Sequence, residues 1–352
     1  MRTIAIVSLH FSPAFIGHMK AWYKLCQMCK LKPYLFIDDR YIKYFKDTEF
    51  RVTSSMDDIM NEQPSYAVVQ NIGFENVVFF KWCKQNNCKI LYILHEPYMG
   101  LCEILKDGTY CIKQVVASLL NIWLCKKSEK VIICSDYANK NCKKYMRKVY
   151  KKSFYMPLLF LNNYIDDNKI EREYISMIGG YAEAHGSDMF LKYAKSAYLN
   201  GSKQKFQIAT RSNIVSKIDD PVFKKMIQEQ ILKVQQGRPL SEEEINLAYR
   251  SSIAVWNGYR RSTQSGVLAN AFMQGTPVIA TDLESFKEFV IDGMTGVYVK
   301  AFDEESIGCA ISSIEKNFET MHLACRDYFL KKFYYRNNVD RLNALISEID
   351  FC

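Results

Sequence analysis

Short apolar, β-branched segments alternate with helical patterns from the first residues of this chain onward. Strand–helix alternation at this spacing predicts a parallel sheet with helices on both faces. The first half therefore reads as one doubly wound α/β domain. Its expected strands are 4–9, 33–38, 66–71, 90–95 and 131–135.

The alternation breaks once and then starts again. Pro157 interrupts the apolar run 153–160, and the polar stretch 162–173 follows it, as in an interdomain linker. New expected strands are 174–180, 206–210, 253–257 and 277–281. We therefore expect two Rossmann-like doubly wound domains, 1–156 and 157–335, that face a cleft. A helix within 336–352 is expected to pack back on the first domain.

Composition excludes several protein classes. Hydrophobic residues make up 49% of the 352 residues and charged residues 24%, which is typical of a globular chain rather than a disordered one. The most apolar run, Val115–Cys125, is too short to span a bilayer, and the N-terminus lacks a cleavage pattern. The twelve cysteines show no disulfide rhythm. We expect a cytoplasmic protein with reduced thiols, in which Cys26 and Cys29 are buried in a helix rather than bound to a metal.

Positive charge is concentrated in one segment. The formal net charge is +9, and residues 126–152 hold many lysines but only two acids, Glu129 and Asp136. Such a field attracts phosphates, either of nucleic acid or of an anionic membrane. No nucleic-acid motif is present, and the apolar stretch 119–124 just before the segment favours the inner face of a membrane. A solvated lysine-rich helix face is the alternative.

The stretch Tyr259–Gly296 carries the strongest chemical signal. Ser262, Thr263 and Ser265 are capping residues before an apolar helix, which Gly275 and Pro277 end. Gln264, Ser265 and Gly266 are therefore expected at a helix N-terminus, where free amides and the helix dipole favour a phosphate. Arg260 and Arg261 stand just upstream and would add positive charge. The alternative is an empty turn between a strand and a helix.

Several ordered motifs resemble family 4 of the GT-B glycosyltransferases, the group 1 enzymes. The run SGVLANAFMQGTPVIATDLESFKEFVIDGMTGVYV (265–299) is similar to the signature of that family's carboxyl domain, with Glu288 as its acidic residue. Upstream, YMPLLF (155–160) resembles the interdomain linker, and 177–194 and 239–259 resemble the elements before the nucleotide site. In the first half the likeness rests on 8–20, LHEPY (94–98) and 131–146.

This resemblance implies roles for particular residues. His95 matches the histidine that lies near the transferred sugar, although a strand-end histidine before proline is also a common structural residue. Gly17 lies in the loop that approaches sugar and phosphate. The implied donor-binding residues are Gly17, Arg211, Tyr259, Arg260, Arg261, Ser262, Thr263, Gln264, Ser265, Gly266 and Asn270.

The sequence also departs from the family pattern. Ser262 and Asn270 occupy the two positions where the family usually has glutamates, and Gly180 and His185 fall near its usual Arg–Lys pair. Arg211, with Arg260 or Arg261, could supply the missing positive charge, because two desolvated phosphates need cationic partners. Asn270 retains an amide for ribose hydroxyls.

The expected function is transfer of a sugar from a nucleotide diphosphate-sugar to a saccharide or lipid-linked saccharide, with retention of configuration and without a metal or other cofactor, in surface polysaccharide synthesis. The first alternative is a GT-B nucleotide-sugar-binding or scaffold protein without transfer activity, because the usual glutamates are missing. The second, a nicotinamide oxidoreductase, requires a GxGxxG turn after a strand, and the sequence has none.

Overall fold

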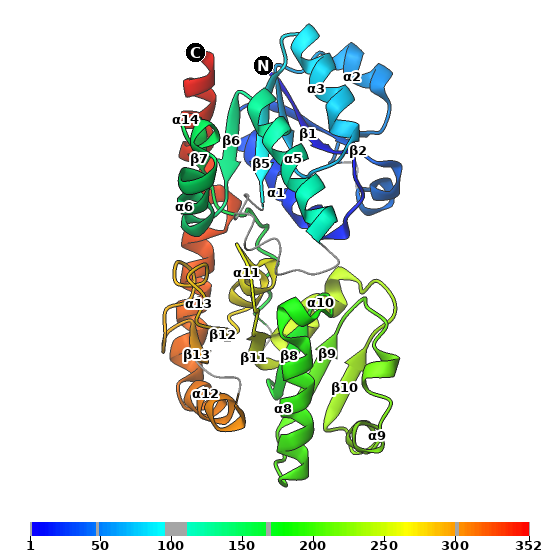
Figure 1. Ribbon diagram of the computed structural model, residues 1–352, viewed down its shortest axis with the longest axis vertical. Helices are drawn as coiled ribbons and strands as arrows, with labels where there is room; N and C mark the ends of the chain where they lie inside the picture. Colours follow the sequence, from blue (N-terminus) through cyan, green and yellow to red (C-terminus); the bar gives the residue numbers. More distant parts are fainter. Residues whose placement is uncertain (1, 47–48, 96–110, 167–169, 300–302, 352) are drawn as a thin grey trace. The chain divides into compact units, whose positions relative to one another are not determined.

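The chain forms two compact units. The computed structural model describes residues 2–46, 49–95, 111–166, 170–299 and 303–351. Unit 1 consists of Met1–Leu161 and Phe333–Cys352, and unit 2 of Asn162–Lys332. Figure 1 shows the chain coloured along the sequence, with the red C-terminal helix α14 belonging to unit 1.

Unit 1 contains a seven-stranded parallel sheet in the order β3-β2-β1-β4-β5-β6-β7. Its strands are β1 (Thr3–Ser8), β2 (Lys32–Ile37), β3 (Val52–Thr53), β4 (Tyr66–Val69), β5 (Lys89–Leu94), β6 (Lys130–Ile133) and β7 (Ser153–Tyr155). Its helices are α1 (Ile16–Met28), α2 (Met56–Glu62), α3 (Glu75–Gln85), α5 (Cys111–Lys127), α6 (Asp136–Tyr145), α7 (Arg147–Tyr150) and α14 (Val339–Asp350). Short 3-10 turns are η1 (Pro13–Phe15), η2 (Asp39–Tyr44) and η6 (Tyr335–Asn338).

Unit 2 contains a six-stranded parallel sheet in the order β10-β9-β8-β11-β12-β13. Its strands are β8 (Tyr174–Ile178), β9 (Lys205–Ala209), β10 (Leu232–Gln235), β11 (Ser252–Asn257), β12 (Val278–Thr281) and β13 (Gly296–Val299). Its helices are α8 (Ser187–Leu199), α9 (Pro221–Gln228), α10 (Glu242–Arg250), α11 (Gly266–Met273), α12 (Glu304–Lys316) and α13 (Phe318–Lys332), with 3-10 turns η4 (Glu183–His185) and η5 (Val215–Lys217).

The central strands are buried on both faces, which explains their continuous apolar sequence. In β1, for example, the four residues Ile4–Val7 have no solvent exposure, and the same is true of Val278–Ala280 in β12. Each unit has its own apolar core between its sheet and its helices. The prediction of two doubly wound α/β domains is confirmed.

The C-terminal helix α14 packs on unit 1. Lys89 Nζ donates a hydrogen bond to the carbonyl oxygen of Ile349 at 2.7 Å, and Tyr66 OH bonds the carboxylate of Asp350. The sequence placed the domain limits after 156 and after 335, whereas the compact units meet after Leu161 and after Lys332. The polar stretch read as a linker therefore belongs to unit 2, where Asn163 bonds Glu242 of α10.

Candidate functional site

The first strand of each sheet marks a point where the strand order changes direction. In unit 2, β8 lies between β9 and β11, so the chain first adds β9 and β10 on one side of β8 and then adds the later strands on its other side. Ligands of open α/β sheets bind beside the carboxyl ends of the strands at such a point. The loop after β8 and the helix after β11 both lie at this edge. They are in close contact, because a Cβ added to Gly179 would lie 3.2 Å from Cγ2 of Val267.

Ser265 caps the helix that follows β11. Its extended backbone, with φ −137° and ψ 115°, ends the loop, and its Oγ accepts a hydrogen bond from Leu268 N at 3.2 Å. The same Oγ donates to Oδ1 of Asn257, the last residue of β11, at 3.0 Å. Asn257 has no solvent exposure, and its Nδ2 has no partner among the described residues. A buried amide donor therefore stands beside the start of α11.

The first turn of α11 leaves room and donors for a ligand. The backbone amides of Gly266 and Val267 make no hydrogen bond within the part of the chain that the structure describes. A Cβ built on Gly266 would meet no atom within 4 Å. Two backbone amides, the dipole of the helix and the Asn257 amide all favour an anion at this place. The structure thus puts the predicted segment 264–266 at a helix N-terminus that is open to a phosphate.

Arg260 is held by a neighbouring helix. Its guanidinium forms a two-pronged ion pair with Asp188 in the first turn of α8, at 3.0 and 2.6 Å, and its amide N donates to Ala184 O at 2.9 Å. Asp188 therefore already compensates the charge that the sequence assigned to the phosphates. The two loops approach so closely that a Cβ on Gly186, whose φ is +66°, would lie 2.0 Å from Gly258 O.

Tyr259 and His185 form the side of this site. Their rings lie 4.6 Å apart, and Nδ1 of His185 bonds the carbonyl oxygen of Gly180 at 2.9 Å. Burial raises the pKa of the Tyr259 phenol, whose oxygen lies 3.5 Å from Ser265 Oγ. In the family pattern that the sequence resembles, the Arg–Lys pair falls near Gly180 and His185. Here they fix the loop after β8 against the loop after β11.

The other predicted donor residues have different surroundings. Asn270 Nδ2 donates to the carbonyl oxygen of Gly266 at 2.9 Å, one helical turn earlier, and Ser262 Oγ donates to Gln264 O at 2.6 Å. Thr263 is buried, and Arg261 is half-buried. Arg211, after β9, is exposed and has no hydrogen bond or ion pair among the described contacts. The donor-binding roles of these residues stay predictions.

His95 lies in unit 1, directly after β5. Its Nε2 bonds the carbonyl oxygen of Gln70 at 2.8 Å, and the ring of Phe15 meets it edge-on at 5.0 Å. Burial, and second the neighbouring His18, lower the pKa of His95 to about 3. The imidazole is therefore neutral at physiological pH, with its proton on Nε2. Residues 96–98 of the LHEPY motif lie outside the described residues.

Gln70 is a polar residue of the same edge that the sequence interpretation missed. It follows β4 and is fully buried, and neither atom of its side-chain amide has a partner among the described residues. It lines, with His18 and His95, a cavity of about 10 Å³, which is enough for one water molecule. Gly17, in the first turn of α1, is exposed with open space around it.

The missed residues share one signal. Gln70 and Asn257 are amides that end or follow a strand of otherwise apolar residues. Such a residue lies at the carboxyl edge of a parallel sheet, where ligands bind. Asp188, the partner of Arg260, is in contrast 72 positions away in the sequence, and no local pattern predicts this contact. Glu288, the acidic position of the family signature, forms an ion pair with Lys332 of α13 at 2.9 Å.

The basic segment is mostly exposed. Eight of its cations lie at the surface of unit 1: Lys126, Lys127, Lys140, Lys143, Lys144, Arg147, Lys148 and Lys151. The apolar stretch before it, 119–124, is largely a core element, because Leu120, Ile122 and Trp123 pack against the core of unit 1. Among the side chains of α5 that the structure describes, Ile112, Val116 and Leu119 are exposed and lie on one helical face. No helix among the described residues is long and apolar enough to cross a membrane.

Comparison with known proteins gives a family match within the second unit. Residues 172–317 match the family described as glycosyl transferases group 1. These residues include β8, the site at α11 and three of the segments that carried the family resemblance, 177–194, 239–259 and 265–299. A comparison with curated proteins finds no match.

Solved structures share the fold along the whole chain. The Anabaena protein HepE in complex with UDP matches with a TM-score of 0.73 at 12% identity, covering 99% of this chain and 100% of HepE. Sucrose-phosphate synthase from Thermosynechococcus elongatus matches with a TM-score of 0.71 at 13% identity, covering 99% of each chain. A Listeria monocytogenes protein described as a UDP-N-acetylglucosamine 2-epimerase matches with a TM-score of 0.64 at 12% identity, over 100% of this chain and 98% of the other.

Proposed function

We propose that this chain is a group 1 glycosyltransferase of the GT-B fold, which transfers a sugar from a UDP-sugar to a saccharide or lipid-linked saccharide. HepE, which shares this fold, was solved with UDP and with UDP-glucose, and this supports uracil as the base. The nucleotide-sugar is a co-substrate, and the proposed reaction needs no metal or other cofactor.

The open N-terminus of α11 carries the proposal. We place the two phosphates of the donor at the amides of Gly266 and Val267, beside Nδ2 of Asn257. UDP is the leaving group, so negative charge grows on its phosphates as the bond to the sugar breaks. Fixed amide donors and the helix dipole stabilise that charge without reorganising in the transition state. We propose that the sugar keeps its anomeric configuration.

His95 is the proposed sugar-side residue of unit 1. The imidazole of His95 is neutral and its Nε2–H is held by Gln70 O, so this side chain suits a contact with the sugar better than one with a negative phosphate. Removing this contact should reduce turnover and leave UDP affinity nearly unchanged.

The test of the donor site is steric. Gly266→Trp fills the open space at the start of α11, and we expect UDP affinity to fall at least about tenfold, since about 1.4 kcal/mol of lost contacts suffices for that factor. The matched control is Glu305→Trp, which places the same indole in the exposed first turn of α12. Calorimetric UDP titrations that give both variants the wild-type affinity would remove the phosphates from α11.

Product analysis separates the possible activities. Wild-type protein incubated with a labelled UDP-sugar and a saccharide acceptor should form a glycoside with retained configuration, which proton NMR detects from the signal of the anomeric proton. An epimerised UDP-sugar without a glycoside would point to epimerase chemistry on this fold. Tight UDP-sugar binding with neither product, over a panel of acceptors, would support a binding or scaffold protein.

We also propose that the protein works on the cytoplasmic face of an anionic membrane, as surface polysaccharide assembly on lipid carriers requires. The support is the exposed basic segment together with the apolar face of α5. Both features lie in unit 1, the unit expected to bind the acceptor. A lipid-linked acceptor would then be held at the surface where its lipid is anchored.

A further inference from the structure

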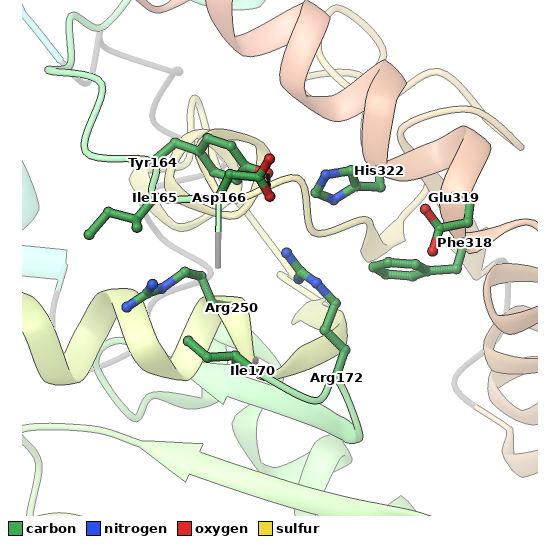
Figure 2. Close-up of a pocket in the computed structure, with 9 residues that line it drawn as sticks. All are labelled: Tyr164, Ile165, Asp166, Ile170, Arg172, Arg250, Phe318, Glu319 and His322. Atoms are coloured by element: carbon green, nitrogen blue, oxygen red, sulfur yellow. Dashed lines mark hydrogen bonds between the residues drawn. The ribbon is translucent and has the colours of Figure 1, made fainter. Parts of the chain in front are cut away.

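A second cavity lies in unit 2, away from the proposed donor site. Its volume is about 390 Å³, within the range of small-molecule pockets. Figure 2 shows the side chains around it, which come from the segment before β8, from the end of α10 and from the start of α13. The lining residues are Tyr164, Ile165, Asp166, Ile170, Arg172, Arg250, Phe318, Glu319 and His322.

Two arginines of this cavity lack a carboxylate partner. Arg172 and Arg250 take part in none of the ion pairs found within the described residues. Five other arginines of the described chain do pair with a carboxylate: Arg2, Arg40, Arg51, Arg238 and Arg260. Asp166 and Glu319 also line the cavity but form no ion pair with either arginine in the part of the chain that the structure describes, so both guanidinium groups can bind the oxygens of an anion.

Arg172 is held in place by backbone carbonyls and one side-chain hydroxyl. Its NH1 donates to Ser252 O at 3.1 Å and to Thr276 Oγ1 at 2.9 Å, and its NH2 donates to Gln274 O at 2.7 Å. Its guanidinium also lies 5.3 Å from the centre of the Phe318 ring. Burial lowers the pKa of this group, but a guanidinium stays charged in a protein. The charge of Arg172 is therefore fixed at the wall of the cavity.

Arg250 and His322 complete the polar wall. Arg250 is the last residue of α10, and its Nε is buried with no partner in the described structure. His322 Nδ1 bonds the carbonyl oxygen of Gly275 at 2.9 Å, so Nε2 is the nitrogen that remains for a ligand. Burial, and second Arg172, lower the pKa of His322. The imidazole is thus neutral in the absence of an anion.

The cavity and the donor site lie at opposite ends of α11. Arg172 and His322 contact Gln274 and Gly275, which follow the last turn of the helix, whereas the proposed diphosphate site is at Gly266. The eight residues of α11 span about 12 Å. A ligand of the cavity is therefore distinct from the donor diphosphate, and both would contact the same helix.

We propose that this cavity binds a small hydroxylated oxyanion, with its phosphate or carboxylate head at Arg172 and Arg250. The planar guanidinium groups match both kinds of head group. Asp166 and Glu319, at the same wall, accept hydrogen bonds from hydroxyl groups and disfavour a polyanion such as a nucleotide. Phe318 offers an apolar surface for the carbon skeleton.

The test follows the histidine signals by NMR. Protein with carbon-13-labelled histidine is saturated with UDP, so that the donor site is filled, and each histidine is titrated with pH. His322→Gln assigns the signal by its disappearance. Glycerol 3-phosphate should raise the pKa of His322 by about 1 unit relative to chloride at equal ionic strength, because an anion within about 4–6 Å stabilises the imidazolium. Glycerate in place of glycerol 3-phosphate distinguishes a carboxylate head from a phosphate head.

Arg250→Gln provides the decisive comparison. It should abolish most of the increase in the His322 pKa, while the matched variant Arg238→Gln, at an exposed arginine of the same unit, should keep it. A His322 pKa that is the same in chloride, glycerol 3-phosphate and glycerate would overturn the proposal. The same conclusion follows if Arg250→Gln and Arg238→Gln respond alike. If UDP does not bind, the proposed donor site at α11 is wrong, but the comparison of Arg250→Gln with Arg238→Gln still tests the cavity.

Discussion

Replacing Asn257 by leucine should move stability and UDP affinity in different directions. The substitution keeps the side chain close to its volume but removes a buried amide. The variant loses the hydrogen bond that Ser265 Oγ donates to Asn257 Oδ1, whose net contribution to stability is about 0.5–1.5 kcal/mol. It also removes the buried Nδ2 that has no partner in the described structure, which relieves about 1–3 kcal/mol. We therefore expect the free energy of unfolding of the UDP-free protein to stay near its wild-type value or to rise.

The effect on UDP should be a loss. If Nδ2 of Asn257 donates to the diphosphate, the hydrogen bond is charge-assisted and contributes about 1.5–3 kcal/mol. At about 1.4 kcal/mol for each factor of ten, the Kd for UDP should increase roughly 10- to 150-fold. Urea denaturation measures the stability, and isothermal titration calorimetry measures the affinity.

Asn338→Leu is the matched control. Asn338 is also buried, but its Nδ2 donates to Tyr334 O at 3.1 Å, and it lies in unit 1. Its replacement should lower the free energy of unfolding and leave the Kd for UDP unchanged. The reasoning fails if Asn257→Leu destabilises the free protein as Asn338→Leu does while UDP binds normally, since the amide would then be a structural group.

Three further results are expected. His95→Gln should reduce the pH dependence of stability between about pH 3 and 6.5. The pKa of His95 is lowered to about 3 in the folded protein, so in this window the imidazole takes up a proton only in the unfolded chain, and the wild-type stability falls as the pH falls. If the free energy of unfolding of the variant depends on pH as that of the wild type does, His95 is not a buried neutral imidazole. Gly275→Ala should cost more stability in urea than Gly201→Ala, although both have positive φ (+67° and +82°), because only the Cβ at 275 meets His322, at 2.2 Å; equal losses would argue against this contact. Replacing four surface cations of unit 1 by glutamine should weaken salt-sensitive binding to phosphatidylglycerol vesicles, whereas replacing four exposed lysines of unit 2 should not. If vesicle binding changes with neither set of replacements nor with salt, the basic segment is a solvated helix face and not a membrane-binding surface. The first set is Lys143, Lys144, Arg147 and Lys148, and the second is Lys203, Lys217, Lys224 and Lys225.

The sequence predicted those features that depend on local patterns. Buried strands such as 4–7 are continuous apolar runs, and Ser265 before an apolar helix is a local capping signal, so both could be located. The compact units follow from packing, and they shift the predicted limits by a few residues. The packing of 119–124 against the core could not be predicted either, because a short apolar run has the same sequence pattern whether it is buried or lies at a surface.

Contacts between distant residues could not be predicted from one sequence. The ion pair of Arg260 with Asp188 and the shared cavity of Arg172, Arg250 and His322 depend on how β8, β11 and α13 are placed beside one another. One sequence does not show which distant residue a polar side chain will contact. The free amide of Asn257 is of the same kind, since only the folded strand shows that nothing in the described chain accepts from Nδ2.

The return of the chain to unit 1 after Lys332 has a consequence for synthesis on the ribosome. The segment that carries unit 2 is complete as soon as residue 332 has emerged, whereas the partners of Tyr66 and Lys89 in α14 are translated only after it. The domain that begins first is therefore completed after the second one. A nascent chain that stalls after residue 332 should hold a folded second domain and an unfinished first one, with an exposed apolar surface for chaperones to bind.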